Sequence, residues 1–179
     1  MQRHFERSLQ ELKDTLVGMG SLVDRQIDCA SQALFEGDLP AAREVIGRDG
    51  VVDEYDNRVD ALCQSILALN QPVAGDLRLL MAALRINTQL ERIGDIAVNI
   101  AERVEPLATQ TGLIRATRLA EMLQIARIMV TDSLNAFLTA DPALARRVMD
   151  SDYVVDGLDR HIFRHLVKMM EDSPSLISV

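Results

Sequence analysis

Residues 38–60 read DLPAAREVIGRDGVVDEYDNRVD, and residues 141–163 repeat the pattern as DPALARRVMDSDYVVDGLDRHIF. Nine of the 23 aligned positions are identical at one constant offset of 103 residues. Self-similarity at a fixed offset is the sequence signature of a repeat architecture. The chain is therefore expected to contain two copies of a unit of about one hundred residues.

Around this stretch, apolar residues recur at steps of three and four, which is the period of one helix face. The first segment carries a long stripe of this kind: Phe5, Leu9, Leu12, Leu16, Met19, Val23, Ile27, Ala30 and Leu34. Gly37 ends this helix, and Asp38 is expected to cap the next one, with Pro40 in its first turn. The expected helices span residues 5–36, 38–69, 73–106, 114–140 and 142–172.

Long helices joined by short connections pack as antiparallel neighbours. We expect an all-α tandem repeat of antiparallel three-helix bundles, with the first bundle in residues 1–106, a linker in 107–113 and the second repeat in 114–179. Pro174 falls within one residue of the position that corresponds to Pro72 in the first copy, so the second bundle is expected to lack its third helix in this chain, through truncation or disorder. The apolar groove left along the last two helices is then expected to be covered by oligomer contacts or by further residues.

Composition excludes several classes of protein. The 27 acidic residues outnumber 19 Lys and Arg, and the net charge of −8 argues against nucleic acid as a partner, because phosphate binding requires clustered basic side chains. No apolar run approaches the ~20 residues that span a bilayer, and the N-terminus lacks a signal-peptide pattern, so we expect no membrane insertion. Cys29 and Cys63 are expected as unpaired core thiols in a reducing compartment.

Four acidic residues of the second expected helix, Asp49, Asp53, Asp56 and Asp60, follow one another at steps of four, three and four. This spacing places their carboxylates in one ridge. Like charges at such steps are mildly destabilising unless a cation neutralises them. Because carboxylate oxygens suit hard cations, the ridge is a candidate site for Mg, Ca, Mn or iron.

The third expected helix adds Glu91 and Asp95 on a side nearly opposite its apolar stripe, so this pair is expected at the surface. The alternative is a solvated charged face without metal, because the five acidic i,i+4 pairs of the chain are no more than its composition predicts. Two features favour metal: the ridge keeps its register over four members, and its first three members recur as Asp152, Asp156 and Asp159.

No motif indicates an enzyme. The sequence has no Glu-x-x-His pair, no phosphate-binding glycine loop and no nucleophile–base arrangement. His161 and His165 stand at i,i+4, but no acid or cysteine completes a ligand set on that turn, so they are expected to be structural.

Two motifs resemble those of the PhoU family of phosphate-transport accessory regulators. They are QPVAGDLR at residues 71–78 and LERIGDIAVNIAE at residues 90–102. The resemblance covers essentially the whole chain, except for the family's sixth helix. It implies two similar three-helix bundles, a cytoplasmic location, and homodimers or higher oligomers.

The resemblance also implies a function and a metal site. The family acts between a Pst-type phosphate ABC transporter and a phosphate-responsive sensor histidine kinase, and it restrains the phosphate-starvation response when phosphate is plentiful. Several members bind iron or zinc clusters through (E/D)xxxD motifs. These motifs fall here on residues 56–60 and 91–95, with Asp49 and Asp53 one and two turns away.

Two details qualify the site. Gly94, between the two acids of the third helix, is expected to let a neighbouring backbone come close. In the second copy Phe163 stands where the fourth acid of the ridge belongs, which leaves a second metal site in doubt.

We therefore expect a non-enzymatic, metal-binding helical regulator that represses phosphate uptake and phosphate-starvation signalling. It would dock on the transporter ATPase and on the sensor kinase. Two alternatives stay open: a metal-free helical adaptor or oligomerisation module, and a metal-dependent hydrolase, for which the sequence offers neither a general base nor an open coordination position.

Overall fold

The computed structural model describes residues 2–174 and 176, and these residues form only helices and the connections between them. The fold is all-α, as the apolar periodicity predicted. Its elements are α1 (Gln2–Glu36), α2 (Leu39–Gly47), α3 (Asp49–Asn70), α4 (Ala74–Glu102), α5 (Val104–Leu107), the 3₁₀ helix η1 (Ala108–Gln110), α6 (Thr111–Arg115), α7 (Leu119–Thr139) and α8 (Pro142–Asp172).

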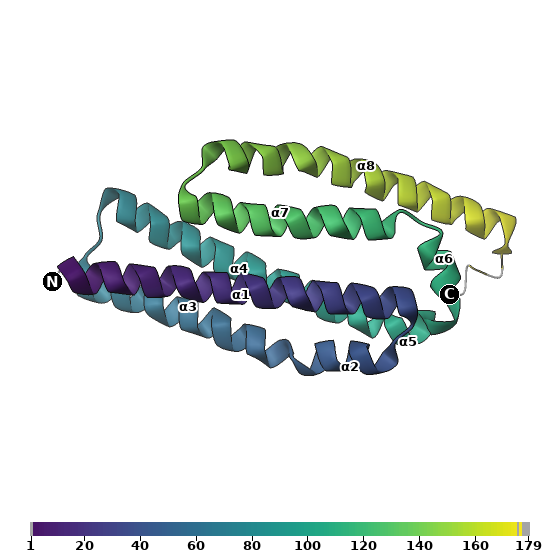
Figure 1. The fold of residues 1–179 in the computed structure, drawn as a ribbon, viewed down its shortest axis with the longest axis horizontal. Coiled ribbons are helices and arrows are strands. Elements are labelled where there is room, and N and C mark those ends of the chain that lie inside the picture. The colour runs from purple at the N-terminus through teal and green to yellow at the C-terminus, as the bar shows by residue number, and fades with distance from the viewer. Residues whose placement is uncertain (1, 175, 177–179) are drawn as a thin grey trace.

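The long helices α1, α3 and α4 pack side by side into one bundle, with α2 at one end (Figure 1). The apolar stripe of α1 lies at its centre, where Leu12, Leu16 and Met19 are fully buried. Val59 of α3 and Leu80 of α4 are fully buried as well. The first repeat is therefore a three-helix bundle held together by the faces that the sequence period marks as apolar.

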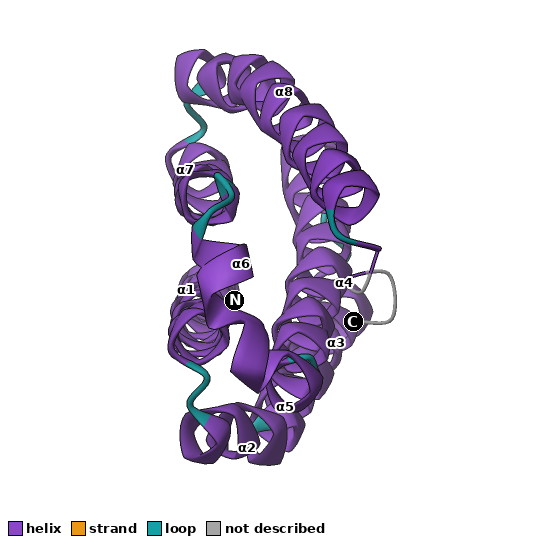
Figure 2. Ribbon diagram, turned by 90° about the vertical axis from the view of Figure 1, so that its right-hand side faces the viewer, coloured by secondary structure: helices purple, strands orange, loops and turns teal. Residues whose placement is uncertain are grey.

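The second repeat contributes only the hairpin of α7 and α8. Viewed along the helices, α7 lies beside α1 and α8 lies on the side of α4 (Figure 2). In the described part of this hairpin only Ala136, Leu158 and Ile162 are buried, because two helices cover less of each other than three do. The expected groove along these two helices is present, and α4 forms its third wall.

The second expected helix is not continuous. It breaks at Arg48, where φ is −98° and ψ is 2°, so that α2 and α3 are separate helices. Glycines at positions 47 and 50 weaken the helix there, and Nε2 of Gln26 donates to the carbonyl of Arg48 at 3.3 Å. The equivalent stretch of the second repeat lacks both glycines, and α8 runs through it without a break.

The linker at residues 107–113 is not irregular backbone, because α5, η1 and α6 occupy most of this connection. The next long helix begins at Leu119 rather than at Ile114. Ile114 is 8% exposed and joins the core, and Nε of Arg115 donates to the carbonyl of Phe35 at 2.8 Å. Short helical turns satisfy the backbone while they bring this apolar side chain inward.

The helix ends repeat between the two halves. Gly37 closes α1 with φ 73°, and Ala140, which is 103 positions later, closes α7 with φ 53°. The predicted cap at Asp38 is confirmed, since its carboxylate accepts from N of Ala41 at 3.0 Å. Asp141 caps α8 in the same manner, by accepting from N of Ala143 and N of Leu144.

The two cysteines differ in environment. Cys63 is fully buried between α3 and its neighbours, as predicted, and burial raises the pKa of its thiol to about 11. The prediction for Cys29 is wrong, because this residue is exposed on α1. No helix in the described part of the chain has a stretch long and apolar enough to cross a bilayer.

Candidate functional site

The acidic residues of α3 line its solvent side, because the opposite side of the helix is buried through Val52 and Val59. Asp53 is exposed, whereas Asp49, Asp56 and Asp60 are half-buried, and all four belong to α3. The ridge that the spacing predicted therefore exists as a surface feature of one helix. The structure decides what faces it.

The facing residues come from α4, which packs directly on α3. Glu91 is half-buried and Asp95 is exposed, on the surface side of α4. Gly94, between them, is buried on the side of α4 that faces the bundle. A Cβ at this position would lie 3.2 Å from Cγ1 of Val52. The expectation of a close backbone is thus corrected, because the close neighbour is a side chain.

The pKa values link these acids into one electrostatic unit. The pKa of Asp49 is raised by burial and by the charges of Asp53 and Asp95. Burial and the charges of Asp60 and Asp53 raise the pKa of Asp56. The pKa of Glu91 is raised by burial and by Asp95, Asp56 and Asp53. Charges from both helices thus act on the same groups, and we call the six residues 49, 53, 56, 60, 91 and 95 the acidic surface.

No cation neutralises this surface within the part of the chain that the structure describes. None of its six carboxylates is in an ion pair there. Arg48 pairs instead with Glu44, and Arg58 pairs with Glu11 at 3.1 Å. The acidic surface is therefore an uncompensated cluster of negative charge, which favours binding of a cation.

Asn87 binds the acidic surface from its buried side. The sequence pattern did not point to this residue. It is fully buried on α4, where its Nδ2 donates to Oδ1 of Asp56 at 2.8 Å and to the backbone carbonyl of Asp56 at 3.0 Å. Oδ1 of Asp60 lies 3.4 Å from the same nitrogen. The available signal was an amide inside the apolar stripe of α4, where a polar side chain needs a partner.

A second buried amide lies near the break between α2 and α3. Gln26 of α1 is 3% exposed, and its Oε1 lies 3.6 Å from the point where a Cβ of Gly94 would stand. Neither Oε1 of Gln26 nor Oδ1 of Asn87 has a hydrogen-bond partner within the described structure. Gln26 donates to the carbonyl of Arg48, which directly precedes α3, and Asn87 donates to the carbonyl of Asp56 within α3.

The chemistry of the six side chains suits a metal ion, but their present positions do not. Carboxylate oxygens are suitable ligands for hard cations, and six carboxylate groups belong to this one surface. However, no group of three or more His, Cys, Asp or Glu side chains is close enough to hold a metal ion among the described residues. The side chains would have to move together around an ion, and Asp53 and Asp95 are the exposed ones among them.

The second repeat does not reproduce the acidic surface. Asp152, Asp156 and Asp159 are exposed on α8, and Asp156 lies 3.8 Å from Arg160 in an ion pair. Phe163, in place of the fourth acid, is 67% exposed. On the same helix the rings of His161 and His165 stack with centroids 6.4 Å apart.

Comparison with known proteins places this architecture among characterised folds. The sequence model described as "PhoU domain" matches residues 16–104 and 119–178, which are the two repeats. The crystal structure of PhoU from Pseudomonas aeruginosa superposes with a TM-score of 0.88 at 32% identity, over 97% of this chain and 84% of that one.

Curated relatives align with nearly the full length of this chain and with about three quarters of their own length. The phosphate-specific transport system accessory protein PhoU homolog of Aquifex aeolicus is 36% identical over 168 residues, which are 94% of this chain and 76% of the relative. The protein of the same description from Pseudomonas putida is 34% identical over 99% of this chain and 70% of its own length.

Proposed function

This chain belongs to the PhoU family, and from that premise we propose that it is a negative regulator of phosphate uptake and of phosphate-starvation signalling. As a member of this family it is an accessory regulator of phosphate transport and not an enzyme. The main support for this proposal is that the family match extends over both repeats, so that all the long helices belong to the PhoU fold.

The regulator would act in the cytoplasm by docking. Its partners would be the ATPase of a Pst-type phosphate ABC transporter and the phosphate sensor histidine kinase. The long exposed faces of α3, α4 and α8 support such a role, because rigid helical surfaces present side chains to a partner without a folding step.

We include a metal in this proposal. Iron or zinc is suggested by the family, and Mg, Ca or Mn by the oxygen donors. Asp49, Asp53, Asp56 and Asp60 of α3 would hold it together with Glu91 and Asp95 of α4. When bound, it would neutralise the acidic surface and tie α3 to α4. The pKa values of Asp49, Asp56 and Glu91 are raised by burial and, after it, by the charges of neighbouring carboxylates, and a cation would relieve that repulsion.

A second candidate is a metal-free helical adaptor. One observation favours it: no three acidic side chains converge in the described structure. Both candidates act by docking, so they differ only in whether the acidic surface needs an ion.

Metal analysis of the purified protein separates them. Protein dialysed against each metal and then passed over a desalting column should retain bound ions, and chelation should lower its melting temperature. The double substitution E91A/D95A should abolish retention, whereas the matched pair E54A/E105A, which removes two exposed acids elsewhere, should not. Retention that survives E91A/D95A would refute the site, and no retention by the wild type would favour the adaptor.

The regulatory role is tested in a host that lacks its own PhoU protein. Expression of this chain should silence a phosphate-starvation reporter at high phosphate, and the chain should co-purify with the transporter ATPase and the kinase of that host's system. A folded chain that restores no repression would contradict the proposal.

A further inference from the structure

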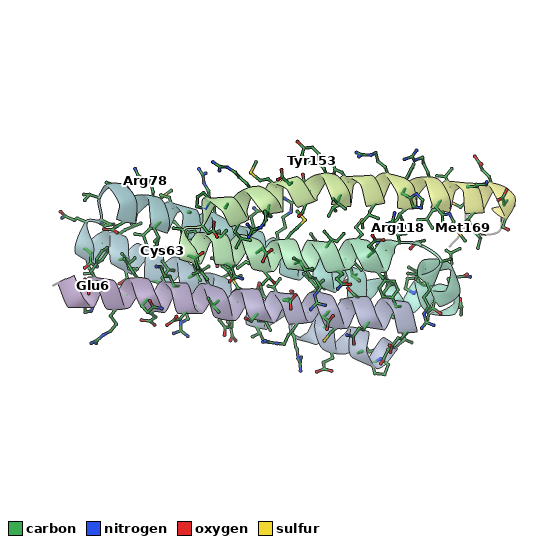
Figure 3. The ribbon with its side chains drawn as sticks, turned by 45° about the horizontal axis from the view of Figure 1, so that its top comes forward. Glu6, Cys63, Arg78, Arg118, Tyr153 and Met169 are labelled. Atoms are coloured by element: carbon green, nitrogen blue, oxygen red, sulfur yellow. The ribbon has the colours of Figure 1, made fainter. Side chains whose placement is uncertain are left out.

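His161 and His165 stand one turn apart on α8, and neither belongs to the acidic surface. Four residues of a helix advance it by about 6 Å and turn it by about 40°, so both side chains leave the same side of α8. Their rings are nearly parallel, with an interplanar angle of 4° and centroids 6.4 Å apart. Met169, labelled in Figure 3, lies one turn beyond the pair, in the second half of α8. The two imidazoles therefore already lie side by side.

No side chain holds either ring within the described part of α8. The hydrogen bonds that side chains donate along this helix run from Ser151 and Arg164 to backbone carbonyls. Its ion pair joins Arg160 to Asp156. The ring nitrogens of the two histidines thus have no partner among the described residues and can bind a ligand from solution.

Solvent reaches both histidines. His161 is exposed and His165 is half-buried. The equivalent positions of the first repeat, Arg58 and Leu62, are likewise exposed and half-buried, although that repeat has a third long helix. The exposure of the pair therefore follows from its side of the helix and not from the number of helices in the second repeat.

Two imidazoles in this arrangement suit a transition metal. Histidines at i,i+4 on one helix face supply two ligands of the zinc sites with the motif His-Glu-x-x-His. Imidazole nitrogen suits Zn, Cu and Ni, whereas carboxylate oxygen suits Mg, Ca and Mn. Nitrogens bound to one tetrahedral zinc ion lie about 3.3 Å apart, because each bond is about 2.0–2.1 Å long. Rotation about χ2, which is broad for histidine, brings the two rings toward this separation.

We propose that His161 and His165 form a second metal site, which binds a divalent transition metal such as Zn²⁺ through one nitrogen of each ring. The described residues contain no group of three or more His, Cys, Asp or Glu side chains close enough to hold a metal, so the ion keeps positions for water. Ile162 stands where the zinc-protease motif has its glutamate, so no general base accompanies the ion. The site is independent of the metal proposed for the acidic surface, because it uses nitrogen ligands of the other repeat.

Zinc binding is best measured on the variant C29S/E91A/D95A, which removes the exposed thiol and two acids of the acidic surface. Calorimetric titration with Zn²⁺ should detect the site, and NMR should show imidazole signals of two of the three histidines shifting together. H161Q and H165Q should each weaken binding by about tenfold or more, because the second ring no longer binds the same ion. H4Q in this background is the matched control and should leave binding unchanged.

A change of spacing distinguishes a shared ion from two independent ligands. F163H/H165Q keeps three histidines but moves the second ring to position 163, about 200° around the helix from His161. Phe163 is 67% exposed, so the substitution leaves the core intact. This variant should bind Zn²⁺ no more tightly than H165Q does. Binding as tight as that of the parent variant overturns the proposal, and so does a parent in which Zn²⁺ shifts neither His161 nor His165.

Discussion

Arg127 of α7 pairs with Asp24 of α1, and the two residues occupy the same position in the two repeats, 103 residues apart. The contact is bidentate, with Nε at 2.9 Å from Oδ1 and the second guanidinium nitrogen at 3.0 Å from Oδ2. Asp28 pairs with the same arginine. One repeat position is thus an acid in the first copy and a base in the second, and the two repeats join through this pair.

Removal of Arg127 should loosen the attachment of the hairpin to the first bundle. R127Q is expected to lower the free energy of unfolding by about 1–2 kcal/mol, since the pair is only partly screened and Asp24 and Asp28 lose a shared donor. Urea denaturation measures the change, and a cycle with D24N isolates the pair. An unchanged midpoint in R127Q would show that the pair contributes nothing.

Replacing Ala140 by glycine should stabilise the protein. Its φ of 53° lies in the left-handed region that costs an L-residue about 1–2 kcal/mol, while Gly37 at the equivalent position avoids this cost. A140G is expected to raise the stability by about 1 kcal/mol, and G37A to lower it by a similar amount or more. Thermal melts of both variants check the sign, and a destabilised A140G would contradict the argument.

Replacing Asn87 by aspartate should destabilise the protein more than replacing it by alanine. N87A is expected to cost about 1–3 kcal/mol, because the carboxylate and the carbonyl of Asp56 lose their buried donor. N87D should cost more, because it adds a buried carboxylate next to Asp56 and Asp60. Chemical denaturation ranks the two variants, and equal losses would show that repulsion from the acidic surface does not reach this site.

The acidic surface should make the metal-free protein less stable as the pH rises. The pKa of Asp49 and of Glu91 is raised in the folded state, so the folded protein binds these protons more tightly than the unfolded chain does. Stability is then highest with the carboxyls protonated and falls as the pH rises from about 4 through the raised values. In chelator, D49N/E91Q should fall less steeply than the wild type. E54Q, at an exposed acid of the same helix, serves as the control, and identical slopes for D49N/E91Q and the wild type would refute the coupling.

The two thiols should react at different rates. Cys29 is exposed and should react with a thiol reagent within the native state, whereas Cys63 is fully buried and its pKa is raised to about 11, so it should react only on unfolding. Titration with an aromatic disulfide should show one fast thiol and a second that appears with urea. C29S should lose the fast phase, and a fast phase that persists in C29S would mean that Cys63 is accessible.

Much of the architecture follows from local patterns. The apolar step of three and four along Leu12, Leu16 and Met19 defines the buried face of α1 before any partner is known, because a helix has one period. The fixed offset of the repeat likewise predicts that the caps at Asp38 and Asp141 are equivalent. The ridge on α3 follows from the same helical geometry.

Local sequence patterns do not determine which helix faces pack against one another. The acids of α3 stand opposite Glu91 and Asp95 only because α4 packs on α3, and Asn87 joins them only through that packing. The amide of Gln26 that donates to Arg48 at the helix break comes from another helix, and the different burial of Cys29 and Cys63 depends on which helix sides are covered.

By itself the sequence determined the long helices, their apolar faces and the ridge of carboxylates on α3, because each depends on residues within a few turns of one helix. It also determined the repeat, through identities at one fixed offset. The tertiary structure alone decided the union of two acidic helices into one surface, the pairing of Arg127 with Asp24 and the place of α4 as the third wall of the groove beside α8. These features join groups far apart in the chain, whose distances are set by how helices pack and not by helical period.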